Sequence, residues 1–186
     1  MVLRLDHDRF PWYQRGMEPL EGFPPIVHAD SRILILGSMP SVKSLEMHEY
    51  YGYPTNAFWP IMETFCGCPL PDWDAKVDML ISSHIALWDV VSSCERKGSA
   101  DSAIRNIRFN ALKEVLEHYP GISHILCNGT TAMRLFQRYN RNLGSHRIVL
   151  PVVPLLSTSA ANTVSYEKKC QIWTENLHKL LDLSRL

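Results

Sequence analysis

The sequence of 186 residues has no long apolar segment that could cross a membrane. No apolar run approaches the roughly 18 residues that a membrane-spanning helix requires. The N-terminal segment MVLRLDHDRFPWYQRG has no apolar stretch of the kind found in a secretory signal peptide. We therefore expect an intracellular, cytoplasmic protein with no membrane partner.

The sequence also has no net charge, because 19 basic and 19 acidic side chains cancel. This balance argues against a tight, non-specific binder of polyanions. A nucleic-acid enzyme with a local basic groove stays open, since basic side chains gather between residues 134 and 147. A solvated helix face explains that cluster equally well.

Metal and nucleotide signatures are missing as well. The five cysteines include only one close pair, Cys66 and Cys68, and no set has the spacing of a zinc or iron–sulfur site. The loop after the first apolar run lacks the Gly-x-x-x-x-Gly-Lys pattern that cradles a nucleotide triphosphate. We therefore expect five reduced thiols, no metal site and no cofactor.

What the sequence does have is a regular alternation of short apolar runs and helical patterns. The apolar runs cover 33–36, 84–90, 124–127 and 148–153, and runs this short fit strands buried on both faces of a parallel sheet. Helical patterns occupy 58–65, 73–82, 111–119, a segment opening at 129, and 164–183. This order predicts one α/β domain over 1–186, a three-layer α/β/α sandwich with a central four-stranded parallel sheet. Residues 1–30, rich in proline and aromatics, form an N-terminal lead-in to it.

Ligands in such sheets bind beyond the carboxyl ends of the strands. That rule selects the loops 37–56, 89–101, 128–131 and 155–162. The first loop turns at Gly37 and is expected to start a short helical turn within residues 38–41. It then carries Tyr50, Tyr51 and Tyr53 between elements. Such aromatics usually fill a core, but together with an asparagine amide they also suit a nucleobase rotated out of a duplex.

LGSMPS followed by YYGYPTNAFW resembles the first motif of the uracil-DNA glycosylase superfamily, and most of all its hypoxanthine-DNA (deoxyinosine) glycosylase branch. LLSTSAANTVSYEKK at 155–169 resembles the second superfamily motif, and LWDVVSSCERKGSADSAI at 87–104 resembles the deoxyinosine branch. Together the three stretches cover the chain from about residue 24 to residue 173. The resemblance implies the fold of that superfamily and hydrolysis of the N-glycosidic bond of deaminated bases in DNA base excision repair.

The resemblance also implies which residues act. Where mismatch-specific relatives carry a water-positioning asparagine, this chain has Met39, whose thioether is only a weak acceptor. The catalytic load then moves to Asn56, although Asn56 equally suits a cap for a helix starting at residue 57. Asp89, at the end of the second strand, is the second catalytic candidate, and it too could instead cap the next element.

The remaining predicted contacts divide between the base and the DNA backbone. For the base, the resemblance implies stacking on Tyr51, and backbone amides at a turn into a helix suit its carbonyl oxygen. The predicted base contacts are Gly37, Ser38, Met39, Tyr51 and Phe58. For the DNA, it implies small polar residues: Ser41, Ser157, Thr158, Ser159 and Asn162. Capping of the last helix by Ser159 or Asn162 is the structural alternative.

Two other functions stay open. The first keeps the class but changes the base to uracil, or to uracil or thymine mispaired with guanine. The second is a non-catalytic nucleic-acid-binding protein of the same fold, because fold alone does not prove function. No lysine occupies the place of a lyase nucleophile, so base release without strand cleavage is expected. The expected partner is double-stranded DNA with a flipped damaged base, bound by a monomer.

Overall fold

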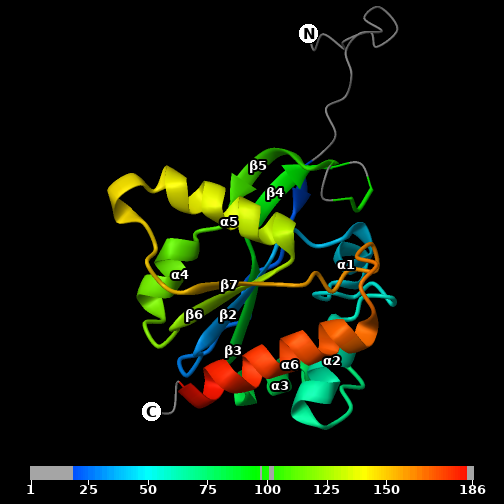
Figure 1. The fold of residues 1–186 in the computed structure, drawn as a ribbon. Coiled ribbons are helices and arrows are strands. Elements are labelled where there is room, and N and C mark those ends of the chain that lie inside the picture. The colour runs from blue at the N-terminus through cyan, green and yellow to red at the C-terminus, as the bar shows by residue number, and fades with distance from the viewer. Residues whose placement is uncertain (1–18, 97, 101–102, 184–186) are drawn as a thin grey trace, which may run out of the picture.

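The computed structural model describes residues 19–96, 98–100 and 103–183. Its central sheet is parallel, with the strand order β3-β2-β6-β7. The strands are β2 (Ile33–Gly37), β3 (Ile85–Asp89), β6 (His124–Asn128) and β7 (Val152–Leu155). Helices cover both faces of this sheet (Figure 1). The predicted three-layer α/β/α sandwich with a four-stranded parallel sheet is therefore confirmed.

The helices divide between the two faces. Figure 1 shows α2 (Phe58–Cys66), α3 (Trp73–Ser82) and α6 (Tyr166–Leu183) on one face. The other face carries α4 (Leu112–His118) and α5 (Thr130–Asn142). A short helix, α1 (Val42–Met47), lies beyond the end of β2, and a 3-10 turn, η3 (Gly144–His146), follows α5. All five helical patterns of the sequence thus correspond to helices.

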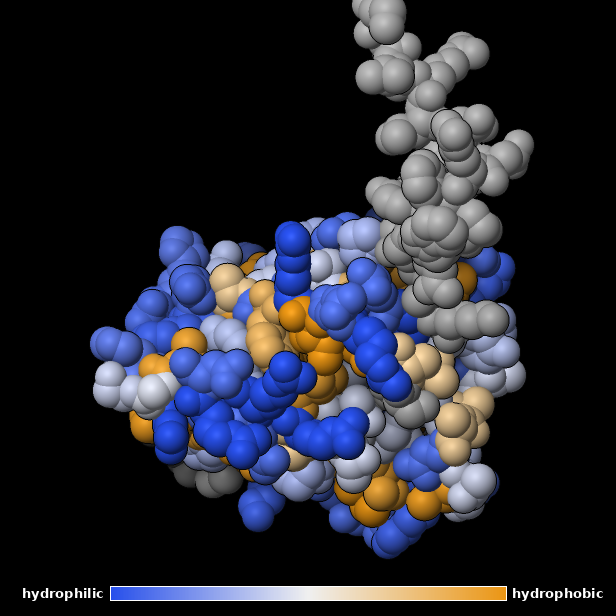
Figure 2. All heavy atoms as spheres, turned by 90° about the horizontal axis from the view of Figure 1, so that it is seen from above, coloured by the Kyte–Doolittle hydropathy of each residue, from blue (hydrophilic) through white to orange (hydrophobic). Residues whose placement is uncertain are grey.

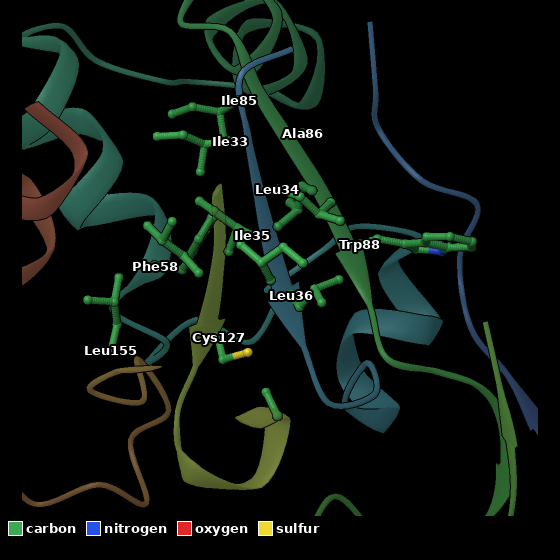
Figure 3. Close-up of a cluster of buried hydrophobic side chains, with 14 of the residues drawn as sticks. Ile33, Leu34, Ile35, Leu36, Phe58, Ile85, Ala86, Trp88, Cys127 and Leu155 are labelled. Atoms are coloured by element: carbon green, nitrogen blue, oxygen red, sulfur yellow. The ribbon is translucent and has the colours of Figure 1, made fainter. Parts of the chain in front are cut away.

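The core is built around β2, whose four apolar residues are all fully buried. Side chains alternate between the two faces of a strand, so an apolar residue at every position requires helices on both sides. Figure 3 shows Ile33 and Ile35 on the side of the sheet where Phe58 lies, and Leu34 on the opposite side. The Phe58 ring meets the Trp173 ring of α6 edge to face, with centroids 5.8 Å apart.

A second, antiparallel sheet is a feature that the sequence interpretation missed. It has the order β1-β4-β5 and consists of β1 (Leu20–Glu21), β4 (Val91–Glu95) and β5 (Arg105–Phe109). The prediction of a loop over 89–101 is therefore wrong for 91–95. The sequences VSSCE and RNIRF are short and polar, and their pairing contains register shifts, so no clean period-2 signal marks them.

The last strand was predicted at 148–153 but spans Val152–Leu155. The Asn140 side chain binds the Ile148 backbone at both ends, accepting from its N–H at 2.7 Å and donating to its carbonyl at 3.0 Å. Val149 is 92% exposed. Because the Asn140 side chain satisfies the hydrogen bonds of the Ile148 backbone, the first half of the predicted strand does not pair with β6.

The described part of the lead-in packs against the domain, whereas residues 1–18 lie outside the described residues. Ile26 and Leu87 exchange two backbone hydrogen bonds of 2.9 and 2.8 Å. The Phe23 carbonyl accepts hydrogen bonds from Trp88 Nε1 at 2.9 Å and from the Tyr50 hydroxyl at 3.3 Å. Residues 20–26 therefore belong to the folded unit.

Two further properties bear on the site. Within the described part of the chain, none of the helices has the length and apolar character needed to cross a membrane. The five cysteines are free thiols in the structure.

Candidate active site

The carboxyl ends of the four parallel strands meet at one edge of the sheet. The chain leaves β2 for β3 on one side and later returns to β6 on the other, which makes the end of β2 the topological switch point where such folds bind ligands. Gly37 pairs with Asp89 across β2 and β3, and Asn128 pairs with Leu155 across β6 and β7. The four strand-end loops of the sequence interpretation thus start from one edge.

At this edge the first loop and β3 are in direct contact. A Cβ placed on Gly37 would lie 2.1 Å from Asp89 Oδ1 and 2.9 Å from the Tyr51 hydroxyl. A carboxylate and a phenol therefore approach the same point of the backbone, and only glycine leaves room for them. Asp89 is 3% exposed, so this carboxylate lies in a site largely shielded from water.

The carbonyls of the first loop are turned toward the segment that follows β3. The Gly37 carbonyl accepts from Val90 N–H at 3.0 Å, and the Ser38 carbonyl accepts from Val91 N–H at 3.1 Å. Because C=O and N–H point in opposite directions across a trans peptide, the N–H groups of Ser38 and Met39 point away from β4. The Met39 side chain is buried in the core, so its backbone amide is the part of this residue that is open to a ligand.

The two aromatic residues predicted to contact the base, Tyr51 and Phe58, are stacked on each other. The centroids of Tyr51 and Phe58 are 4.1 Å apart with an interplanar angle of 24°, which leaves no room for a base between them. Phe58 is fully buried, whereas Tyr51 is half-buried and has a φ of 54°. Tyr51 is therefore the ring of this pair with a face near solvent, and Phe58 lies behind it.

Tyr50, next to this pair, has a buried hydroxyl that donates to the Pro24 carbonyl at 3.1 Å. Burial raises the pKa of Tyr50 above its ordinary range, and the nearby Asp89 carboxylate raises it further. The phenol therefore stays protonated at any physiological pH. Tyr50 acts as a scaffold that fixes Tyr51 and the lead-in.

Asn56 uses one end of its amide for local structure. Its Oδ1 accepts the Phe58 N–H at 3.0 Å, at the first residue of α2, which begins where the 58–65 pattern predicted. The N-cap position itself is Ala57, which has no side-chain cap, so of the predicted capping role only this hydrogen bond is present. The Asn56 Nδ2 group donates to none of the described residues, so the same side chain still has a donor for a ligand.

The second motif loop contacts the first motif at Ala57, the residue that follows Asn56. The Ala57 N–H donates to the Thr158 carbonyl at 2.9 Å. Asn128 Nδ2 donates to Thr158 Oγ1, and Asn128 Oδ1 accepts from Thr158 N–H, both at 2.9 Å. Thr158 is 1% exposed, so in this conformation its hydroxyl supports the loop and does not face a ligand.

Asn128 is a residue that the sequence interpretation did not select. Its position at the carboxyl end of the third parallel strand was the signal that could have identified it. Its two hydrogen bonds to Thr158 fix the second motif loop against the end of β6. The close approach of Gly129 to Ser157, where a Cβ would lie 2.8 Å from Ser157 Cβ, tightens the same junction.

The rest of the second loop is held by its own hydrogen bonds. Asn162 Nδ2 donates to the Ser157 carbonyl at 3.1 Å, and Ser159 Oγ accepts from Ala161 N–H at 3.2 Å. Neither Ser159 nor Asn162 caps α6, because α6 begins at Tyr166 and Ser165 Oγ accepts the Lys168 N–H. The predicted helix start at 164 and the capping alternative are both wrong.

Ser41 caps α1, since its Oγ accepts the Ser44 N–H at 3.1 Å. The helical turn expected within 38–41 therefore begins at Val42, with Pro40 ahead of the cap. The Ser41 hydroxyl is engaged in this cap, so it is not free to act as a separate contact to a ligand.

Two buried cations lie under these loops, and the sequence interpretation assigned neither of them to the site. Arg96 is 5% exposed, and its Nη2 donates to the Pro40 carbonyl of the first loop. Lys169 is 4% exposed, and its Nζ donates to the carbonyls of Ser159 and Asn162 at 3.3 and 2.7 Å. No pattern of charges in the sequence distinguishes these two from solvated lysines and arginines.

In the part of the chain that the structure describes, no group of three His, Cys, Asp or Glu side chains is placed to hold a metal ion. The site offers instead a shielded carboxylate, a phenol, an amide donor and outward backbone N–H groups. These groups can position water and stabilise a departing anion. They match hydrolysis of a bond to a planar, hydrogen-bonding leaving group.

Comparisons with known proteins agree with this geometry. The family model of the uracil DNA glycosylase superfamily matches residues 24–181. A hypoxanthine DNA glycosylase of Methanosarcina barkeri is 31% identical over 157 residues, covering 83% of this chain and 96% of the relative. One from Methanosarcina acetivorans is 36% identical over 143 residues, covering 76% and 87%.

A solved structure points the same way. The solution NMR structure of a candidate uracil DNA glycosylase from Methanosarcina acetivorans has a TM-score of 0.72 and 31% identity. The match covers 87% of this chain and 98% of that one. With the family model spanning nearly the whole described chain, the resemblance seen in the motifs is confirmed. The chain belongs to the uracil DNA glycosylase superfamily.

Proposed function

We propose that the protein is a monofunctional DNA glycosylase that hydrolyses the N-glycosidic bond of hypoxanthine in DNA, the first step of base excision repair. The observation that carries the proposal is the approach of the Asp89 carboxylate and the Tyr51 hydroxyl to the backbone at Gly37. The names of the two Methanosarcina relatives support hypoxanthine as the base.

The base enters the site after rotating out of the duplex, at a cost that is smallest for a damaged or mispaired base. It stacks on the solvent-side face of Tyr51, since the other face is covered by Phe58. Base-to-aromatic stacking contributes about 1–3 kcal/mol. The backbone N–H of Met39, pointing away from β4, donates to the base edge.

Cleavage develops positive charge on the sugar and negative charge on the base. The Asp89 carboxylate stabilises the sugar cation and orients the attacking water. The Asn56 Nδ2 group and the first-loop amides donate to the departing base, which leaves with the electron pair of the broken bond. Water adds to the anomeric carbon and releases one proton, the base anion takes up one proton, and the products are a free neutral base and an abasic site.

The DNA flanking the base meets a basic face on α5. Arg134, Arg138 and Arg141 are exposed and spaced four and three residues apart, so they form one stripe along the helix. No acidic residue occurs between Glu117 and Glu167. Figure 2, which looks down on the side where α5 and β5 lie, shows hydrophilic side chains gathered around a smaller apolar area. Phosphates are the partner that such a stripe of arginines attracts.

The enzyme acts as a monomer on duplex DNA inside the cell. Loop contacts within one chain supply each group named above, so a second copy is not needed for the reaction. Both motif loops come from the same edge of one sheet, and they are joined by the Ala57-to-Thr158 hydrogen bond.

The test is a glycosylase assay on end-labelled duplexes that each hold one hypoxanthine, one uracil, or one thymine opposite guanine. An undamaged duplex of the same sequence is the matched control. Strand breaks that appear only after alkali, and first with hypoxanthine, support a monofunctional hypoxanthine glycosylase. Faster release of uracil or mismatched thymine reassigns the base. Intact folded protein that releases none of the three refutes the proposed function.

A further inference from the structure

We propose that Arg96 and Lys169 are positioning residues that hold the two motif loops with their unpartnered backbone N–H groups directed at the DNA. The inference rests on the proposed function for its ligand, but the structural part stands on the contacts alone. Each cation is buried, each binds loop carbonyls, and each lies under a different motif loop.

The burial of these cations is unusual because charged side chains are seldom fully removed from water. Within the described residues, no carboxylate forms an ion pair with either one. Two further nitrogens of Arg96, Nε and Nη1, are buried and donate to no described residue. Among the described residues neither cation has the counter-ion that would offset the cost of its burial, so their hydrogen bonds to the loop carbonyls are the better explanation for their placement.

What the cations bind is backbone carbonyl oxygen. Charge-assisted hydrogen bonds of this kind are the stronger class, and here they fix the rotation of three peptide planes. They hold Pro40–Ser41 in the first loop, and Ser159–Ala160 and Asn162–Thr163 in the second. In a trans peptide the N–H opposes the carbonyl. The N–H groups of Ser41, Ala160 and Thr163 therefore point away from the buried cations.

These three N–H groups are available to a ligand. None of them donates to another described residue, and Ala160 and Thr163 are exposed. Backbone N–H groups converging from a loop form anion sites, and a positive charge beneath the loop strengthens their attraction for phosphate. The two loops lie side by side through the Ala57-to-Thr158 hydrogen bond. The ligand class is the phosphate backbone of DNA around the flipped nucleotide.

The first experiment compares R96M and K169M with the matched controls R32M and K179M. Methionine keeps an unbranched, flexible chain in place of the apolar stem and removes the charge, and both controls change exposed side chains. Arg32 precedes β2 at the opposite edge of the sheet, and Lys179 lies on α6 with Lys169. The readouts are the single-turnover rate on a hypoxanthine duplex, and the Kd for that duplex at several salt concentrations.

R96M is expected to lower the single-turnover rate about 10²-fold, the usual effect of a small misplacement near the chemistry, with little change in Kd. K169M is expected to raise Kd about tenfold, because amide–phosphate hydrogen bonds no longer form. The slope of log Kd against log salt stays at the wild-type value, because neither side chain itself contacts a phosphate. A slope reduced by about one would mean direct phosphate contact and overturn the proposal, as would wild-type rate and Kd in both variants.

A second measurement covers the case in which a methionine variant does not fold. R96K and K169R keep a buried cation but change the geometry of the donor. In ¹⁵N spectra of the free proteins, the amide signals of Ser41 in R96K, and of Ala160 and Thr163 in K169R, are expected to shift beyond those of other loops. Unchanged amide signals in both variants refute the role. These spectra need no substrate, so they remain decisive even if the wild type releases no base and the proposed function fails.

Discussion

Asp89 Oδ1 lies 2.1 Å from the position that a Cβ of Gly37 would occupy, and the two residues are paired across neighbouring strands. The missing side chain of one residue is thus the space for the carboxylate of the other. This relationship joins the turn after β2 to the acid at the end of β3, and it places both at the switch point of the sheet. The shape of the site therefore depends on both residues together.

Gly37→Ala is expected to displace the Asp89 carboxylate and to abolish measurable excision. Overpacking of this kind costs about 1–3 kcal/mol of stability, which denaturant unfolding measures. Gly144→Ala is the control, because Gly144 has a φ of 57° but no atom within 4 Å of a new Cβ. It should lose about 1–2 kcal/mol from backbone strain with full activity. A Gly37→Ala enzyme that cleaves at the wild-type rate would contradict the arrangement.

Asn56→Asp separates the two uses of the Asn56 amide. Aspartate keeps the acceptor for the Phe58 N–H and is as good a cap as asparagine, but it has no donor. We expect stability close to wild type and excision lowered about 10²-fold or more, the usual cost of losing a donor to a developing anion. Asn56→Ala should lose the same activity and also about 1 kcal/mol of stability. Full activity in Asn56→Asp would leave Asn56 with a structural role only.

Asp89→Asn tests the buried carboxylate without changing its shape. The variant should fold, since Asn110 Nδ2 binds the Asp89 backbone carbonyl and not its side chain. Excision at saturating DNA is expected to fall by about 10²-fold or more, as for other charged groups that orient water. Affinity for hypoxanthine DNA should stay near wild type. Loss of affinity for DNA with an unchanged excision rate would mean that Asp89 contributes to DNA binding and not to the chemical step.

The arginine stripe of α5 predicts a change in salt dependence. Replacing Arg134 and Arg138 by Gln should reduce the slope of log Kd against log salt by about 0.9 for each phosphate that is no longer neutralised. The rate at saturating DNA should not change. The same pair of substitutions at Arg32 and Lys179, also exposed, is the control. Equal slopes of log Kd against log salt in both double variants would mean that the arginines of the stripe contact solvent and not phosphates.

Alkaline pH is expected to destabilise the fold through Cys127. Burial raises the pKa of this thiol to about 12 from an ordinary value of 9.0. The unfolded chain therefore releases the proton first, so the stability that this thiol contributes is complete below pH 9 and is lost as pH rises from 9 to 12. Between these pH values the free energy of unfolding falls by about 1.4 kcal/mol per pH unit for the one proton released.

The measurement is urea unfolding of wild type and Cys127→Ala between pH 7 and pH 11. Plots of the free energy of unfolding against pH should run parallel for the two proteins below pH 8.5. Above it the wild-type plot should fall more steeply, by the slope of one proton, so that the two plots converge. Tyr50, whose pKa is also raised by burial, adds a further loss above pH 10 in both proteins. Parallel curves over the whole range would mean that Cys127 does not titrate differently in the folded state.

Prediction from sequence worked where the signal is local. Apolar runs such as ILIL at 33–36 can be satisfied only by burial on both faces, so the parallel sheet and its flanking helices follow from them. The motifs at 37–59 and 155–169 are also contiguous, and the family match over 24–181 confirms their superfamily. The strand-end positions of Gly37 and Asp89 were found by the same rule.

Prediction from sequence failed where the hydrogen bonds of a polar side chain determine the conformation of a distant backbone segment. Asn140 holds the backbone of residue 148 outside the last strand, and Asn128 turns Thr158 inward. The hairpin partner of β4 is short and polar, and its register shifts hide any period. These effects depend on contacts between residues that are distant in the sequence, and patterns in a single sequence do not specify such contacts.

The sequence by itself determined the layers, the strand-end loops and the superfamily, because periodicity and motif order are properties of consecutive residues. Only the tertiary structure decided that Tyr51 covers Phe58, that Asn56 shares its amide between α2 and the site, and that buried Arg96 and Lys169 lie under the loops. A charged or aromatic residue looks the same in sequence whether it is solvated or enclosed. Its role is fixed by the desolvation and the partners that the fold imposes on it.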